Sequence, residues 1–165
     1  MLLHDGSELT KEQIEELNAN GPYSMAVWNS GGVSVGNEEG LTGRSEYFMK
    51  LIRASILKNF SLEEIKEFSI LDIGCNDGWV LHQLRDLPFS KMVGVEPREK
   101  NINKGKVVRK LLKLENNVDY RVGDVESLKE ETFDIVICAG VLYHVESIPV
   151  ALRSIRKACT KMVFI

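Results

Sequence analysis

The chain has 165 residues, a formal net charge of −3 at pH 7, and hydrophobic and charged fractions of 44% and 27%. This composition is that of an ordinary globular protein with a core of its own, and the mild acidity gives no global basic field for nucleic acid. No apolar run approaches the roughly 20 residues of a membrane-spanning helix, and the N-terminus lacks the basic flank and apolar stretch of a signal peptide. The sequence therefore predicts one cytoplasmic globular unit that makes no membrane contact.

Residues 1–67 are predicted to form a helical and loop extension that acts as a lid or cap. A short amphipathic helix is expected over Thr10–Asn18. Residues 23–43 hold five glycines with little periodicity, which is typical of a lid or binding loop and equally of a simple tether. A longer helix then ends near Asn59, and the capping box Ser61–Glu64 opens one more short helix.

From residue 68 onward, apolar runs alternate with helical periodicity, and residues 68–165 are predicted to form the core. Strands are expected at 68–73, 91–95, 118–122, 133–138 and 162–165, and helices at 78–87, 99–114 and 149–159, with a short turn or helix near 125–129. Strands that alternate with helices imply an α/β fold with a parallel sheet and right-handed crossovers. The printed sequence stops inside an apolar strand. We therefore expect a truncated chain, and a dimer through this edge strand is one expected consequence.

The scattered cysteines, histidines and basic residues carry weaker signals. Cys75, Cys138 and Cys159 are too few and too scattered for disulfides or a CxxC metal site, and we expect small packing residues. His82 has no supporting neighbours in the sequence and is expected at the surface. Nothing in the sequence requires a metal. Lysines and arginines crowd residues 98–113, which predicts a solvated helix face or, alternatively, a site for an anionic partner.

Residues 70–79, Ile-Leu-Asp-Ile-Gly-Cys-Asn-Asp-Gly-Trp, carry the most specific functional signal. A strand, a tight glycine turn and a helix start are the usual place for a nucleotide-like ligand in an α/β sheet. A dinucleotide fingerprint G-x-G-x-x-G fits poorly, because Asn76 and Trp79 stand where its second and third glycines belong. A phosphate loop fails because no Lys-Ser or Lys-Thr pair follows the glycines.

Acids stand at the ends of three successive predicted strands. Asp72 lies two residues before the first glycine of the turn, Glu96 ends the second strand, and Asp124 follows the third. A carboxylate about 20 residues beyond the glycines suits ribose hydroxyls, whereas acids beside a pyrophosphate would repel it. The three acids therefore favour a ligand that is cationic at one end and carries hydroxyls and an adenine amine elsewhere.

In order and spacing, these motifs resemble those of class I S-adenosylmethionine-dependent methyltransferases of the methyltransferase-11/25-like type. The resemblance covers about residues 68–165 and rests on Leu71–Gly78, Val93–Pro97, Gly123–Val125 and Phe133–Cys138. It implies a Rossmann-like three-layer sandwich, with helices on both faces of a mostly parallel sheet whose five strands lie in the order 3-2-1-4-5. It also implies S-adenosylmethionine as cofactor, S-adenosylhomocysteine as product, and methyl transfer to an O, N or C nucleophile.

The resemblance also implies a role for individual motif residues. Asp72 would hold the methionine ammonium, Glu96 both ribose hydroxyls, and Asp124 the adenine amine. Asn76 departs from the more usual glycine, yet asparagine tolerates positive φ better than most residues. The implied cofactor contacts are Asp72, Gly74, Cys75, Asn76, Gly78, Glu96, Pro97, Asp124, Val125 and Ala139.

Tyr143 and His144 follow the fourth predicted strand and are the candidate catalytic residues. Histidine can act as a general base near neutral pH, and the alternative is that His144 caps or packs the following helix. The Val-Leu-Tyr-His run at 141–144 resembles that of relatives that modify the wobble uridine of tRNA. We expect a small-molecule acceptor first, with RNA as the alternative. Two other hypotheses stay open: a non-catalytic S-adenosylmethionine-binding regulatory module, and an NAD-dependent oxidoreductase.

Overall fold

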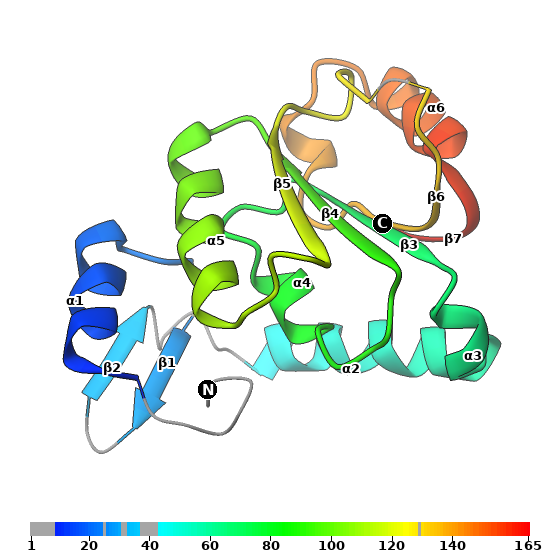
Figure 1. Cartoon of the computed structure of the whole chain (residues 1–165). Helices are drawn as coiled ribbons and strands as arrows, with labels where there is room; N and C mark the ends of the chain where they lie inside the picture. The colour runs from blue at the N-terminus through cyan, green and yellow to red at the C-terminus, as the bar shows by residue number, and fades with distance from the viewer. Residues whose placement is uncertain (1–8, 25, 31–32, 37–42, 129) are drawn as a thin grey trace.

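One parallel sheet forms the centre of the computed structural model, which describes residues 9–24, 26–30, 33–36, 43–128 and 130–165. Its strands are β3 (Ser69–Ile73), β4 (Lys91–Glu96), β5 (Val118–Val122), β6 (Phe133–Ile137) and β7 (Cys159–Phe164). They lie in the order β5-β4-β3-β6-β7, and every neighbouring pair is parallel (Figure 1). Counted along this sheet alone the order is 3-2-1-4-5, so the predicted Rossmann-like α/β fold is confirmed.

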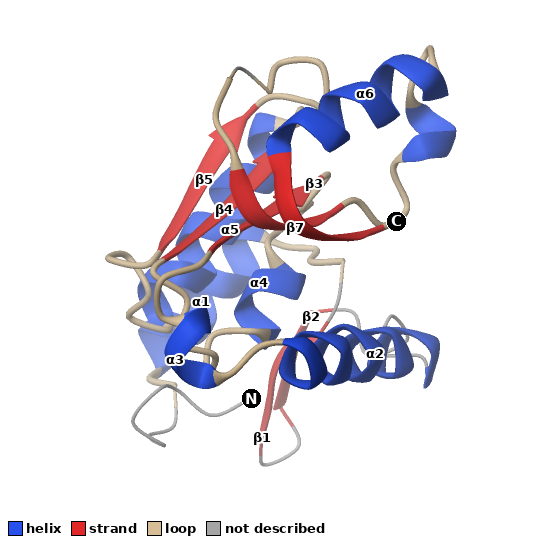
Figure 2. Ribbon diagram, turned by 90° about the vertical axis from the view of Figure 1, so that its right-hand side faces the viewer, coloured by secondary structure: helices blue, strands red, loops and turns tan. Residues whose placement is uncertain are grey.

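Helices cover both faces of the sheet. On one face pack α4 (Trp79–Gln83) and α5 (Glu99–Leu111), and on the other packs α6 (Ile148–Ala158), as Figures 1 and 2 show. Successive strand residues point to opposite faces. Ile70 accordingly belongs to the apolar cluster under α4 and α5, and its neighbour Leu71 to the cluster under α6. The two clusters hold the three layers together by apolar burial.

The N-terminal extension packs against the outside of α5. The first helix, α1 (Lys11–Asn20), contacts α5 and begins at a capping box formed by Thr10. Part of the segment predicted to be a long loop forms an antiparallel pair instead, β1 (Ala26–Ser30) and β2 (Val33–Gly36). The prediction was wrong there because the strands are short and glycine interrupts their alternation, although a Gly-Gly pair between two such runs is itself a hairpin signal.

Two further helices complete the extension and lead into the sheet. The longer, α2 (Gly43–Asn59), buries Ile52 and Ile56 in the cluster under α4 and α5. The shorter, α3 (Leu62–Ile65), begins at the predicted capping box, in which Ser61 and Glu64 bond each other's backbone N–H groups. Within the described part of the chain, no helix has the length and apolar character needed to cross a membrane.

The helix α4 is shorter than expected, and its last turn tightens as the N–H of Leu84 donates to the carbonyl of Leu81 at 3.1 Å. Of the two alternatives predicted for residues 125–128, the structure forms the turn and not the helix, because the side chain of Asp124 bonds the following backbone N–H groups and competes with a helical turn. A 3-10 turn that the sequence did not predict, η2, spans Leu142–His144.

The register of the sheet brings the motif residues to one edge. Asp72 of β3 lies beside Gly94 of β4 and Ile137 of β6, and Glu96 is the last residue of β4. The carboxyl ends of these three strands therefore meet. In parallel α/β sheets, ligands bind in the crevice outside such ends.

Candidate active site

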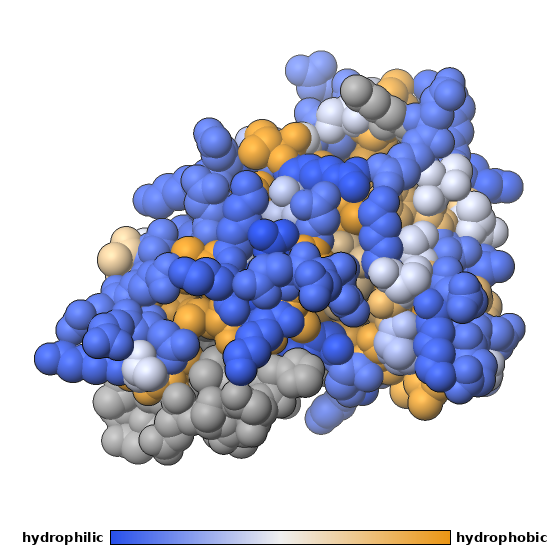
Figure 3. All heavy atoms as spheres, in the orientation of Figure 1, coloured by the Kyte–Doolittle hydropathy of each residue, from blue (hydrophilic) through white to orange (hydrophobic). Residues whose placement is uncertain are grey.

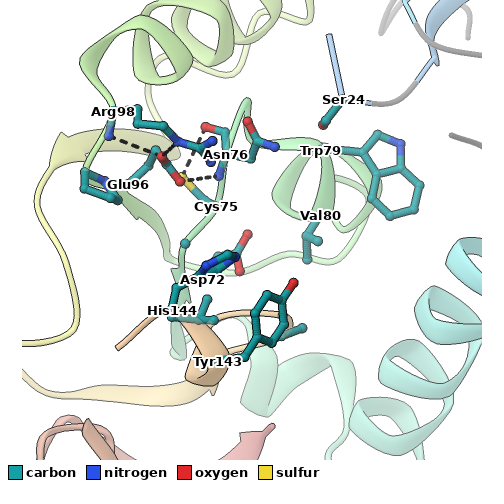
Figure 4. A pocket seen from close by; sticks show the side chains of 15 residues that line it. Ser24, Asp72, Cys75, Asn76, Trp79, Val80, Glu96, Arg98, Tyr143 and His144 are labelled. Atoms are coloured by element: carbon teal, nitrogen blue, oxygen red, sulfur yellow. Dashed lines mark hydrogen bonds and ion pairs between the residues drawn. The ribbon is translucent and has the colours of Figure 1, made fainter. Parts of the chain in front are cut away.

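A cavity of about 700 Å³ lies at the carboxyl ends of β3, β4 and β6 (Figure 4). In this view Glu96, Arg98 and Asn76 gather on one side of the cavity, and Tyr143 lies on the other. The sequence-predicted residues that line it are Asp72, Gly74, Cys75, Asn76, Glu96, Pro97, Ala139, Tyr143 and His144. The fold thus brings together most of the candidate cofactor contacts and both catalytic candidates.

The glycine turn after β3 follows an unusual backbone path. Three of its residues have positive φ: +71° at Gly74, +52° at Asn76 and +80° at Gly78. Asparagine therefore does supply a left-handed conformation where the family more often has glycine. The N–H groups of Gly74 and Cys75 both donate to the carbonyl of Val95, at 2.7 and 3.1 Å. These two donors tie the turn to β4 rather than point to a ligand.

Tyr120 of β5 packs behind this turn. A Cβ at Gly78 would lie 1.9 Å from the Tyr120 hydroxyl oxygen, and one at Gly94 would lie 2.8 Å from its ring. The hydroxyl oxygen lies 2.7 Å from Nε2 of His82, and both side chains are buried. The expectation that His82 lies at the surface was wrong, because its partner Tyr120 comes from a strand 38 residues away. Burial lowers the pKa of His82 to about 3, so its ring is neutral.

Asp72 is the buried acid on the wall of the cavity. The residue is 3% exposed, and no donor among the described residues bonds its Oδ2. Burial first, and then the neighbouring carboxylate of Glu96, raise the pKa of Asp72 to about 8. A buried carboxyl group without a partner is costly, and a cation beside it offsets that cost. The site therefore fits the cationic end of the cofactor that the motifs imply.

Glu96 is a buried carboxylate that already holds hydrogen-bond donors. Its Oε1 accepts from Nε of Arg98 at 2.5 Å and from the backbone N–H of Arg98 at 3.2 Å. Its Oε2 accepts from the backbone N–H of Asn76 at 3.3 Å. The hydrogen bond to Glu96 raises the pKa of Arg98 above its ordinary value. A charged carboxylate at the end of β4 is chemically suited to ribose hydroxyls.

Three residues predicted as cofactor contacts lie outside the lining of this cavity. Gly78 is the N-cap of α4, behind the turn. Asp124 is exposed, and its Oδ1 accepts from the backbone N–H groups of Glu126 and Ser127 at 3.0 and 2.8 Å. Val125 is buried in the cluster under α6. Contacts of Asp124 and Val125 with an adenine ring therefore stay predictions.

Tyr143 and His144 lie on the turn η2, and in Figure 4 Tyr143 is on the side of the cavity opposite Glu96, with His144 nearer to Asp72. The side chain of Tyr143 is largely in solvent, with the residue 77% exposed, and His144 is exposed as well. Their ring centroids are 4.2 Å apart. The backbone N–H of His144 donates to the carbonyl of Val141 at 2.8 Å, which fixes the turn while leaving both rings at the cavity.

Gly140 lines the cavity beside the predicted Ala139, and five other lining residues were not predicted from the sequence: Ser24, Trp79, Val80, Arg98 and Val141. Val141 explains part of the glycine pattern, because a Cβ at Gly74 would lie 2.4 Å from its Cγ2. Ser24 comes from the N-terminal extension, and no sequence spacing could have placed it there. Two hydrogen bonds join Ser24 to the carboxylate of Asp77, which lies 53 residues further along the chain.

Comparison with known proteins identifies the family of this chain. The sequence model of a family described as a methyltransferase domain matches residues 71–162, more than half of the chain. The chain therefore belongs to this methyltransferase family. The class I S-adenosylmethionine-dependent methyltransferase resemblance of its motifs is confirmed.

Curated relatives carry a more particular name. The tRNA U34 carboxymethyltransferase of Campylobacter hominis is 33% identical over 114 residues, which cover 67% of this chain and 37% of the relative. The protein of the same name in Campylobacter lari is 28% identical over 152 residues, which cover 91% and 50%. The chain thus spans between a third and a half of the length of these relatives.

Solved structures share the fold. The N-terminal domain of EvdMO1, solved with S-adenosylhomocysteine bound, has a TM-score of 0.66 and 23% identity, and the match covers 93% of this chain and 63% of that one. The YcgJ protein of Bacillus has a TM-score of 0.57 and 19% identity, with 70% and 47% covered. At these identities the likeness establishes the fold.

Proposed function

We propose that this chain binds S-adenosylmethionine in the cavity and presents its methyl group to an acceptor that enters past Tyr143 and His144. The observation that carries the proposal is the unpartnered Oδ2 of Asp72, buried beside the glycine turn on the cavity wall. A ligand with a cationic amino-acid end and a ribose suits Asp72 and Glu96 together. A dinucleotide would instead bring phosphate charge close to Asp72, which is unfavourable.

The residues of the site bind the cofactor and align its methyl group with the acceptor. S-adenosylmethionine supplies, when bound, a methyl group that its sulfonium has already activated. Asp72 provides the counter-charge for the cationic end, and Glu96 accepts from the ribose hydroxyls. Ala139, two residues after β6, leaves room for the acceptor. Alignment of the methyl group with the acceptor contributes up to roughly 7–11 kcal/mol. His144 takes up a proton only if the acceptor must lose one during transfer.

Two acceptor classes are supported by separate observations. A small molecule is favoured by the cavity, whose volume of about 700 Å³ is within the usual range of small-ligand sites. RNA is favoured by the Campylobacter relatives, whose name gives tRNA U34 as the substrate. The exposed ring of Tyr143 also offers a surface on which a base can stack.

The basic segment 98–113 gives less support for RNA binding along α5 than Tyr143 gives for RNA entry at the cavity. Lys104 and Arg109 donate to backbone carbonyls, of Pro22 and of β5 respectively. Lys110 lies 3.8 Å from Glu16 of α1. Figure 3 shows a mainly hydrophilic surface on this side of the molecule, to which both acids and bases contribute. We therefore expect an RNA acceptor to enter at Tyr143.

We also propose that residues 1–67 act as a cap on the cofactor core formed by residues 68–165. Support comes from Ser24, which lines the cavity, and from Tyr23, which is buried in the cluster that the extension shares with the core. Burial raises the pKa of Tyr23 to about 12. A cytoplasmic location and a dimer through β7 stay predictions.

Two measurements test the proposed function. Calorimetry of the 165-residue chain should show binding of S-adenosylhomocysteine and none of NAD; the reverse result would support an oxidoreductase. Incubation with tritiated S-adenosylmethionine and either a cell extract or tRNA should transfer label to one fraction, which also decides between the acceptor classes. Binding with no transfer by this chain or by a longer chain that contains it would favour a non-catalytic binding module.

A further inference from the structure

The carboxylate of Glu96 already accepts hydrogen bonds from three N–H groups of the protein. A carboxylate offers about four lone-pair sites. Two N–H groups of Arg98 and one of Asn76 already use three of them (Figure 4). Two ribose hydroxyls need two acceptor sites, so at least one existing donor must leave Glu96 when the cofactor binds.

The side chain of Arg98 is the donor that can leave most easily. The two backbone N–H groups are fixed, one at the junction of β4 with α5 and the other at the left-handed residue Asn76. The Arg98 side chain is 66% exposed, whereas that of Glu96 is 2% exposed. The guanidinium also lines the cavity. It can turn away from Glu96 without movement of the main chain.

Asn101 is a second hydrogen-bond partner for the guanidinium of Arg98. Asn101, in the first turn of α5, is buried next to it. With its amide turned so that the oxygen faces Arg98, the oxygen accepts from Nε and Nη2 of Arg98 at 3.1 and 3.2 Å. Arg98 therefore keeps one hydrogen-bond partner on α5 after it gives up Glu96.

We propose that Arg98 is a displaceable counter-ion, which pairs with Glu96 and competes with the cofactor ribose for it. This inference rests on the proposed function. The guanidinium offsets the negative charge of Glu96, which lies near a second buried acid, Asp72. The same competition acts against the product S-adenosylhomocysteine, which carries the same ribose, and so favours its release.

The test compares Arg98→Met with the wild-type chain by calorimetry with S-adenosylhomocysteine. Methionine keeps much of the length of the stem but removes the charge and the donors. We expect the dissociation constant to fall about two- to fivefold, the range that ion pairs with an exposed partner contribute. Arg121→Met is the matched control, because Arg121 pairs with Asp119 and Glu131 outside the cavity. Its affinity for S-adenosylhomocysteine should equal that of the wild type.

A second comparison isolates the ribose. The ratio of the affinities for adenosine and 2′,3′-dideoxyadenosine should be larger in Arg98→Met than in the wild type, because the hydroxyls then meet no competitor. An unchanged ratio, or weaker binding of S-adenosylhomocysteine by Arg98→Met, would overturn the inference while leaving the cofactor site intact. If the wild-type chain binds neither S-adenosylhomocysteine nor adenosine, the proposed function itself fails.

Discussion

Two hydrogen bonds join Ser24 of the N-terminal extension to Asp77 of the glycine turn. The backbone N–H of Ser24 donates to Oδ2 at 2.6 Å, and its hydroxyl donates to Oδ1 at 2.7 Å. Asp77 is buried, and Ser24 lines the cavity. A single carboxylate thus fixes part of the cavity wall to the turn that is expected to carry the cofactor.

Asp77→Ala should loosen this wall. The substitution leaves two donors of Ser24 without their charged acceptor, and hydrogen bonds to charged groups contribute about 1.5–3 kcal/mol. We expect the free energy of unfolding to fall by about that amount, and limited proteolysis to cut faster near residues 22–24. Asp119→Ala, which removes an exposed acid of β5, is the control. It should change the free energy of unfolding by no more than about 0.5 kcal/mol and leave the rate of proteolysis near residues 22–24 unchanged. Equal proteolysis of both variants would contradict a role for Asp77 as the anchor.

Gly78 and Gly140 allow the cost of strain to be separated from the cost of a clash. Both have positive φ, +80° and +74°. A Cβ at Gly78 would meet the Tyr120 hydroxyl oxygen at 1.9 Å, whereas a Cβ at Gly140 would meet only that of Tyr143, at 3.4 Å. Gly140→Ala should therefore cost about 1–2 kcal/mol from backbone strain, and Gly78→Ala about 1–3 kcal/mol more.

Denaturant unfolding of the two alanine variants measures this difference. The buried ring of Tyr120 cannot swing aside, because its hydroxyl oxygen lies 2.7 Å from Nε2 of His82. The exposed Tyr143 can. Equal losses of stability in the two variants would show that Tyr120 does not hold the turn as tightly as its packing indicates.

The strands and helices of the sheet could be predicted because apolar runs and helical periodicity are local patterns. The order of the strands came from the family resemblance, which the motifs around Asp72 and Glu96 carry, and β3 and β4 do lie side by side. The left-handed conformation at Asn76 also followed from residue type alone. Each of these features depends on a few consecutive residues, and the tertiary packing of the chain is compatible with it.

The rest of the site depends on contacts between distant segments. The hydrogen-bonded pair of His82 with Tyr120 and the bond of Ser24 to Asp77 join residues 38 and 53 positions apart, and no periodicity signals either. Asp124 was placed by analogy, whereas in the structure its carboxylate caps its own turn. The pairing of Arg98 with Glu96 is local, yet it could not be predicted, because an arginine after a strand is usually solvated.

Glu96→Ala tests the ribose contact. If the carboxylate accepts from the ribose hydroxyls, its loss should weaken binding of S-adenosylhomocysteine by about 1.5–3 kcal/mol, the scale of a hydrogen bond to a charged group. Calorimetry measures the change, and circular dichroism shows whether the variant is folded. Glu131→Ala, whose carboxylate pairs with Lys91 and Arg121 away from the cavity, is the control. An unchanged affinity in folded Glu96→Ala would remove Glu96 from the cofactor site.

Asp72 should make the stability of the chain measured without ligand fall as pH rises. Its pKa of about 8 lies above the ordinary value of 3.8, so between these values only the folded chain holds the proton. Stability should therefore decrease by up to about 1.4 kcal/mol per pH unit across that window. His82, whose pKa is lowered to about 3 from 6.5, gives the opposite slope below neutral pH.

Denaturant unfolding of the wild type and Asp72→Asn from about pH 7 to about pH 8 avoids the contribution of His82. The wild type should lose stability over this range and the variant should not, and saturating S-adenosylhomocysteine, whose ammonium favours the ionised carboxylate, should flatten the wild-type slope. Parallel slopes without ligand would mean that Asp72 is already ionised in that sample.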